Sequence, residues 1–191
     1  MVTLDKLNED GLLSYEDKHL LENLALGEEN ILVIGNDKEM NGLLLMAILK
    51  KRLGPADGET WYFKSRDDLD IGLPSVINSK FVKSYIDARE LVRPMPFVPI
   101  VIDEINTQAI ADFFLNCCVG LRNRVTATYT HWGDDKTVLE SFAQLTRPTE
   151  GVDYRSLDTV VNYVKDMVKV FVIYTEVDGQ KKIYTVDNRR Q

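Results

Sequence analysis

Residues 29–53, ENILVIGNDKEMNGLLLMAILKKRL, predict a buried strand, a short loop and a helix. Residues 31–34 form an uninterrupted apolar run, which is typical of a parallel strand covered by helices on both faces. A helix is expected over residues 43–53, ended by Gly54 and Pro55. A phosphate-binding loop would lie at the joint, and the segment from Gly35 to Gly42 has the length of one.

The residues of this segment depart from the pattern GxxxxGK[ST]. With Gly35 as the first glycine, Met40 stands at the second glycine, Asn41 at the lysine and Gly42 at the serine or threonine. In a phosphate loop the lysine neutralises charge and the hydroxyl holds magnesium. Losing a charged donor to phosphate forfeits about 1.5–3 kcal/mol.

The remaining charges of the segment do not repair this loss. Asp37 and Glu39 would bring carboxylates toward the phosphates, and Lys38 stands three positions before the expected lysine. We therefore predict a degraded phosphate loop, whose residues are Gly35, Asn36, Asp37, Lys38, Glu39, Met40, Asn41 and Gly42.

Composition excludes several classes of protein. The net charge of −7 disfavours direct binding of nucleic acid. Cys117 and Cys118 are adjacent and make no CxxC spacing, so neither a disulfide framework nor a metal site is expected. The N-terminal residues lack the apolar core of a signal peptide, and no apolar run could span a bilayer. These features predict a cytoplasmic protein without membrane insertion.

Along the rest of the chain, strand and helix patterns alternate. Helices are expected at 14–26, 81–92, 107–120, 134–145 and 156–167, strands at 60–64, 99–105 and 124–132, and a loop at 66–79. Asp178 and Gly179 form a strong turn signal between two C-terminal strands. The sequence predicts one α/β domain with a mostly parallel sheet, helices on both faces and a closing antiparallel hairpin.

The order of these segments resembles a known family. The segments NILVIG, PIVIDEI, VGLRNRVTATYTHW and VLESFAQL, followed by the hairpin, are similar in order to the secretion (traffic) ATPase superfamily of type IV secretion and conjugation, type II secretion and type IV pili. The resemblance covers residues 4–186 and implies the RecA-like P-loop NTPase fold of the family's C-terminal half. We expect one such domain over residues 1–191, without the family's N-terminal domain.

The resemblance implies roles for two residues. Glu104 falls on the Walker B glutamate, which polarises the attacking water in the family, and its neighbour Asp103 could hold magnesium through water. His131 falls on the histidine box, whose histidine lies near the γ-phosphate. A solvated strand end for Glu104 and an ordinary hydrogen bond for His131 are the alternatives. We treat both residues as vestigial catalytic positions.

Other positions of the family pattern are altered. Lys64 and Ser65 occupy the acidic pair of the family's acidic box, although Asp68 fits its second part. Asn106 stands where an arginine often follows the Walker B glutamate. Together with the degraded loop, these changes favour a pseudo-ATPase.

We therefore expect a catalytically degenerate relative of the secretion ATPases, and not an enzyme, with a structural or regulatory role in a secretion, conjugation or pilus apparatus. It would use no cofactor, and its partners would be proteins of that apparatus or further copies of itself. One alternative is an active ATPase with an atypical phosphate loop, which would use ATP and magnesium with Lys38 or Lys50 as the cation. Another is an unrelated α/β binding module.

Overall fold

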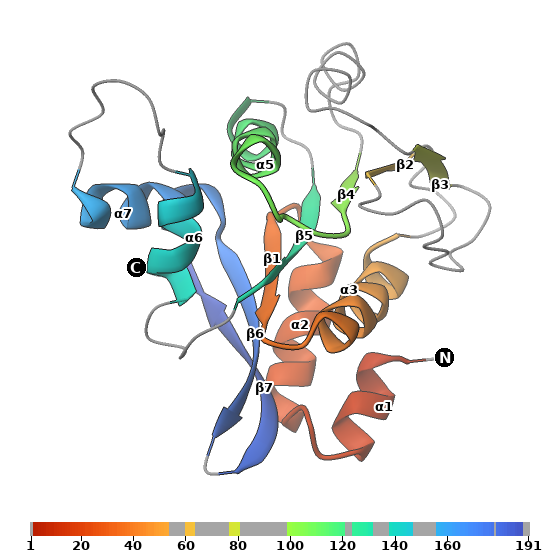
Figure 1. Cartoon of the computed structure of the whole chain (residues 1–191). Coiled ribbons are helices and arrows are strands. Elements are labelled where there is room, and N and C mark those ends of the chain that lie inside the picture. Colours follow the sequence, from red (N-terminus) through yellow and green to blue (C-terminus); the bar gives the residue numbers. More distant parts are fainter. Residues whose placement is uncertain are drawn as a thin grey trace.

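A computed structural model describes residues 2–53, 60–63, 77–80, 99–120, 124–131, 138–146, 156–177 and 179–188 (Figure 1). Its helices are α1 (Leu4–Glu9), α2 (Tyr15–Leu26), α3 (Lys38–Arg52), α5 (Gln108–Gly120), α6 (Val138–Thr146) and α7 (Leu157–Met167). Its strands are β1 (Ile31–Gly35), β2 (Thr60–Phe63), β3 (Ile77–Lys80), β4 (Ile100–Ile102), β5 (Val125–Thr130), β6 (Val170–Val177) and β7 (Gln180–Asp187).

The strands form one seven-stranded sheet in the order β3-β2-β4-β5-β1-β6-β7. β1 lies between β5 and β6 and pairs in parallel with both, so that Ile31 is opposite Thr126 on one side and Val170 on the other. Only the β6–β7 pair is antiparallel, and its turn contains Gly179 at φ 75°. The predicted parallel sheet with a C-terminal hairpin is therefore confirmed.

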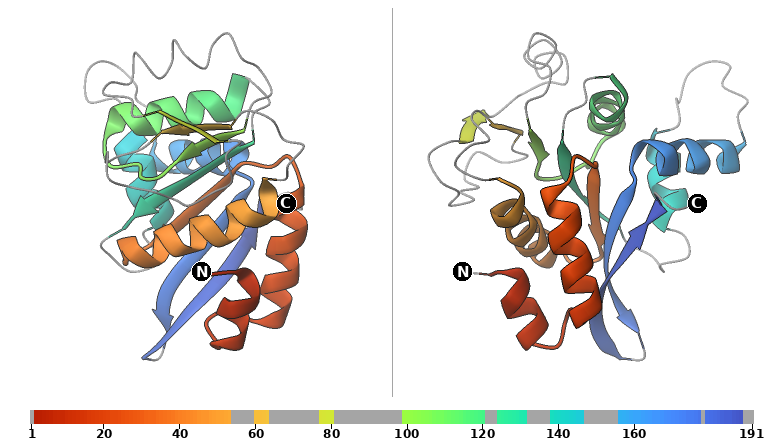
Figure 2. Two further views of the ribbon diagram at one scale, coloured as in Figure 1. Left: turned by 90° about the vertical axis from the view of Figure 1, so that its right-hand side faces the viewer. Right: turned by 180° about the vertical axis from the view of Figure 1, so that it is seen from behind.

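Two helical layers cover the sheet, with α2 and α3 on one face and α6 and α7 on the other (Figure 2). The side chains of β1 alternate between them: Ile31 and Val33 pack with α2 and α3, and Leu32 and Ile34 pack with α5 and α6. All four are fully buried, which explains the uninterrupted apolar sequence of this strand. The carboxyl ends of β1, β4 and β5 consequently meet at one edge of the sheet.

The start of α3 differs from the sequence prediction. The helix begins at Lys38, five residues before the expected start at Leu43, because Asp37 caps it. The segment predicted as a loop up to Gly42 is therefore helical in its second half. Asn41, Leu44 and Leu45 are already buried in these first turns, so tertiary packing also favours the earlier start.

Other differences concern short elements. Residues 77–79 were predicted as loop, but Ile77–Lys80 forms β3 and pairs in parallel with β2. The first helix, α1, was not predicted; Thr3 caps it, and Leu4 and Leu7 bury its apolar face. The expected helix at 81–92, the acidic box at 64–69 and the first residues of the helix expected at 134–145 lie outside the described residues.

The N-terminal segment covers the outer edge of the hairpin. The backbone N–H of Ile183 donates to the carbonyl of Leu12 over 2.8 Å, and the N–H of Thr185 donates to Asp17 Oδ1 over 3.1 Å. These bonds satisfy edge groups of β7 that would otherwise be free to pair with another strand. Across the described ranges, we find no helix with the length and apolar character needed to cross a membrane.

Candidate functional site

The junction between β1 and α3 is closely packed around Gly35. A Cβ on this residue would lie 2.5 Å from Asn41 Oδ1 and 3.0 Å from the Tyr174 carbonyl oxygen. The first distance is shorter than real Cβ contacts, and the second, to a backbone atom, is tighter than most of them. The need for glycine here is explained by packing against α3 and β6, without any phosphate.

Asp37 uses its carboxylate to cap α3. Its Oδ1 accepts hydrogen bonds from the backbone N–H groups of Glu39 over 3.0 Å and Met40 over 3.1 Å. The first N–H groups of a helix have no partner within the helix and form a natural site for an anion. At this helix the anion is a side chain of the protein itself.

Asn41, at the position of the phosphate-loop lysine, points into the protein. Its side chain is 1 % exposed, and its Nδ2 donates to the carbonyl oxygens of Gly35 over 3.1 Å and Tyr129 over 3.3 Å. It therefore ties α3 to the ends of β1 and β5. A side chain held in this way does not project from the helix toward a ligand.

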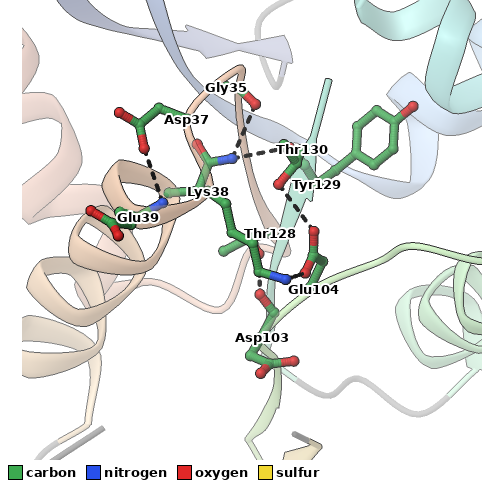
Figure 3. A network of polar contacts seen from close by, with 10 residues as sticks. Gly35, Asp37, Lys38, Glu39, Asp103, Glu104, Thr128, Tyr129 and Thr130 are labelled. Atoms are coloured by element: carbon green, nitrogen blue, oxygen red, sulfur yellow. Dashed lines mark hydrogen bonds and ion pairs between the residues drawn. The ribbon is translucent and has the colours of Figure 1, made fainter. Parts of the chain in front are cut away.

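Lys38 and Glu104 form an ion pair between the first turn of α3 and the segment after β4 (Figure 3). The Glu104 side chain is 9 % exposed and that of Lys38 is 49 % exposed. The second carboxylate oxygen of Glu104 accepts a hydrogen bond from Thr130 Oγ1 over 3.1 Å. Both oxygens of the predicted Walker B glutamate are thus engaged by groups of the same chain.

Asp103 and His131 flank this pair. The backbone of Asp103 is fixed on both sides, because its N–H donates to Phe63 and its carbonyl accepts from the Thr128 hydroxyl. His131 is 6 % exposed, and its backbone N–H donates to the Gly35 carbonyl over 2.9 Å. Glu104 and His131 therefore come to the same edge of the sheet as the start of α3.

A pocket of about 440 Å³ opens beside the start of α3. One wall consists of Asn36, Asp37, Lys38 and Glu39, and the other consists of Tyr174, Thr175, Glu176 and Lys181 of β6 and β7. The neighbouring Tyr174 side chain raises the pKa of Lys181. Sequence reasoning missed Tyr174 and Lys181, because only strand pairing places the hairpin next to this helix.

No metal-binding cluster accompanies the site. Within the part of the chain that the structure describes, no group of three or more His, Cys, Asp or Glu side chains is arranged to hold a metal ion.

Comparison with solved structures identifies the architecture. The VirB11 ATPase of the Brucella suis type IV secretion system, solved in complex with sulphate, matches 98 % of this chain with a TM-score of 0.73 and 18 % identity. The Legionella pneumophila ATPase DotB matches 89 % with a TM-score of 0.62 and 12 % identity. The pilus retraction motor PilT, solved with bound ADP, matches 88 % with a TM-score of 0.64 and 11 % identity.

The chain has the fold of the secretion ATPases. It corresponds to 55 %, 48 % and 49 % of the VirB11, DotB and PilT chains, which is about half of each. No protein-family model and no curated protein matches the sequence. The likeness to secretion ATPases therefore rests on the fold, and the RecA-like architecture expected from the order of the segments is confirmed.

The expectation that the protein uses no cofactor is wrong. It came from the altered loop alone, whereas the structures that share this secretion-ATPase fold are ATPases, and the PilT structure contains ADP. A change of single residues in a loop does not remove the ligand chemistry of a fold, because backbone N–H groups supply much of a phosphate site.

The residues at the β1–α3 junction, as arranged here, do not fit a triphosphate. The N–H groups of Glu39 and Met40 already bond to Asp37, and Lys38 already bonds to Glu104. Asn41 is buried, donates to the Gly35 carbonyl and does not line the pocket. A phosphate would need these internal contacts to open first.

Proposed function

We propose that this protein is a catalytically degenerate secretion-ATPase-like protein. It has a structural or regulatory role in a secretion, conjugation or pilus apparatus, and it acts as a single RecA-like domain over residues 1–191. Its partners are the proteins of that apparatus or further copies of the chain. The fold shared with VirB11, DotB and PilT supports a role in such an apparatus. The two adjacent cysteines, which offer no disulfide framework, support a cytoplasmic location.

The observation that carries the degeneracy is the state of Glu104. A carboxylate that orients an attacking water must direct a lone pair at that water. Both oxygens of Glu104 are engaged, one by Lys38 and one by Thr130. In addition, Asn41 supplies no cation where phosphate-loop chemistry uses a lysine.

A second reading, an active ATPase with an atypical loop, is favoured by one contact. Lys38 reaches Glu104 although it stands early in the loop pattern, so a cation is present at this edge of the sheet. An unrelated α/β module receives no support, because the sheet and its helices match the secretion ATPases over most of the chain.

A turnover assay separates the two readings. Phosphate release is measured for the purified chain with millimolar ATP and magnesium, beside the Glu104→Gln variant at the same concentration. We expect both proteins to release phosphate at the rate of the protein-free blank. Turnover in the native chain that the substitution abolishes would establish the active ATPase.

An assembly experiment tests the structural or regulatory role. The sedimentation of the chain is measured alone and after mixing with a full-length secretion ATPase from the same organism. We expect a faster-sedimenting species that contains both proteins. Two independent boundaries at micromolar concentration, together with a monomeric chain, would remove the proposed role.

A further inference from the structure

Two carboxylates of the chain take the positions of an anionic ligand at the β1–α3 junction. Phosphate sites of this kind use the N–H groups at the start of a helix and a nearby lysine. Here Asp37 accepts from the N–H groups of Glu39 and Met40, and Glu104 pairs with Lys38 (Figure 3). These helix N–H groups and Lys38 are therefore bonded to acids of the same molecule.

The two contacts differ from the rest of the junction in their exposure. Lys38 is half-exposed and Asp37 is partly exposed, whereas Asn41 and Gly35 are buried. The Asp37 and Lys38 side chains can turn away from their partners without opening the packing of α3 on β1. The Asn41 bonds to β1 and β5 would stay in place during that change.

The pocket beside α3 gives a ligand access to these groups. Its volume of about 440 Å³ suits a small ligand, and Asp37 and Lys38 both line it. Lys181 faces the same pocket from β7 and adds a second cation. The carboxylates of Asp37, Glu39 and Glu176 oppose a polyphosphate there, so the balance of charge disfavours binding while the internal contacts are intact.

We propose that Asp37 and Glu104 form an internal latch that inhibits their own site. A polyphosphate binds only after it displaces Asp37 from the N–H groups of α3 and Glu104 from Lys38. This inference rests on the proposed function and deepens it, because it names how ligand entry at that degenerate site is controlled. The ligand class is a di- or triphosphate, and Lys38 becomes its cationic partner on opening.

The test removes the charge of the latch and keeps its shape. Asparagine caps helices about as well as aspartate, and glutamine keeps the hydrogen bond from Thr130, so the Asp37→Asn/Glu104→Gln variant is designed to fold. Binding of ATP and of inorganic pyrophosphate, both without magnesium, is measured by calorimetry at low salt. We expect at least a tenfold tighter dissociation constant in this double variant than in the native chain.

Two further variants identify the cause of such a gain. The Glu16→Gln/Asp158→Asn variant makes the same change in net charge in the first turns of α2 and α7, and we expect less than a twofold effect. Adding Lys38→Met to the latch variant removes the proposed phosphate partner, so we expect most of the gain to disappear. If the latch variant fails to fold, Asp37→Asn alone is measured, with an expected gain of threefold or more.

The latch is overturned if the native chain and the latch variant bind ATP and pyrophosphate with equal affinity. It is also overturned if the Glu16→Gln/Asp158→Asn variant gains as much affinity as the latch variant does. Neither result tests the proposed loss of catalysis. That proposal fails if the native chain hydrolyses ATP and the Glu104→Gln substitution abolishes the hydrolysis. Affinity and turnover thus report on the two proposals separately.

Discussion

Lys38 and Glu104 join α3 to the end of β4 across the end of β5, the strand that lies between β4 and β1 in the sheet. Thr130, the last residue of β5, donates to the same carboxylate. The ion pair therefore connects three neighbouring segments at the edge where α/β folds usually bind ligands. It combines a largely buried acid with a half-exposed base.

Removing one partner of this pair should cost more than removing both. Lys38→Met leaves the Glu104 carboxylate largely buried without its cation, and we expect a loss of about 1–2 kcal/mol in the free energy of unfolding. Adding Glu104→Gln should recover part of that loss, since the group left behind is neutral. Urea denaturation of the two single variants and the double variant measures the coupling. Strictly additive effects would show that the pair contributes nothing to stability.

The two glycines of the predicted phosphate loop should respond in opposite directions to alanine. Gly35→Ala brings a Cβ against Asn41 Oδ1 and the Tyr174 carbonyl, so we expect a loss of about 1–3 kcal/mol. Gly42 lies inside α3, and a Cβ there would meet nothing within 4 Å. Gly42→Ala should therefore stabilise the protein by about 0.5–1 kcal/mol through helix propensity.

Thermal and urea unfolding of the two alanine variants check this pair of signs. Asn41→Ala combined with Gly35→Ala removes one of the two close contacts of the new methyl group, so the double variant should lose less stability than the sum of the single variants. A stable Gly35→Ala variant would contradict the packing explanation for this glycine.

The thiol of Cys117 should be unreactive in the folded protein. It lies on the buried face of α5, and burial raises its pKa to about 12, so almost no thiolate is present at pH 8. We expect reaction with a thiol reagent at pH 8 to be limited by unfolding and to become rapid in urea. The Cys118→Ser variant isolates the signal of Cys117. Fast modification of that variant without denaturant would show that α5 is exposed.

The ion pair between Asp5 of α1 and Lys18 of α2 should make the stability of the fold depend on pH in the acid range. The hydrogen bond and charge of Lys18 lower the pKa of Asp5 below its ordinary value of 3.8. The unfolded chain consequently takes up this proton first as the pH falls. The contribution of the pair is present above that ordinary value and is lost as the pH falls through the lowered pKa of the folded state.

Melting temperatures of the native chain and of Asp5→Asn test this dependence. The native chain should be the more stable protein at pH 7, and the difference should shrink as the pH falls below 3.8. Asp158→Asn, in the first turn of α7, serves as a control with the same change of charge. A difference that is constant between these pH values would mean that the ion pair does not form in solution.

Much of the fold could be predicted from local patterns. The apolar run of β1, the helices expected at 14–26 and 156–167 and the turn signal at Gly179 lie where local chemistry dictates, and the structure confirms each one. β3 was missed because its four residues carry little apolar pattern and gain their place by pairing with β2. The early start of α3 was missed because a phosphate loop was expected where Asp37 caps the helix.

The candidate site could be predicted only in part. Glu104 and His131 follow apolar strands, so their arrival at one edge of the sheet follows from parallel pairing. Their partners do not follow from spacing in the sequence. Lys38 and Glu104 are distant along the chain, and the direction of each long side chain depends on the charges that surround it after folding.

The sequence by itself determined the alternation of most strands and helices and placed Asn41 at the position of the phosphate-loop lysine, because periodicity and residue identity are local properties. Tertiary structure decided that Asn41 turns inward, that Asp37 holds the N–H groups of α3 and that Lys38 meets Glu104. These contacts join separate segments, and their free energy depends on distance and burial, which exist only once the sheet has formed.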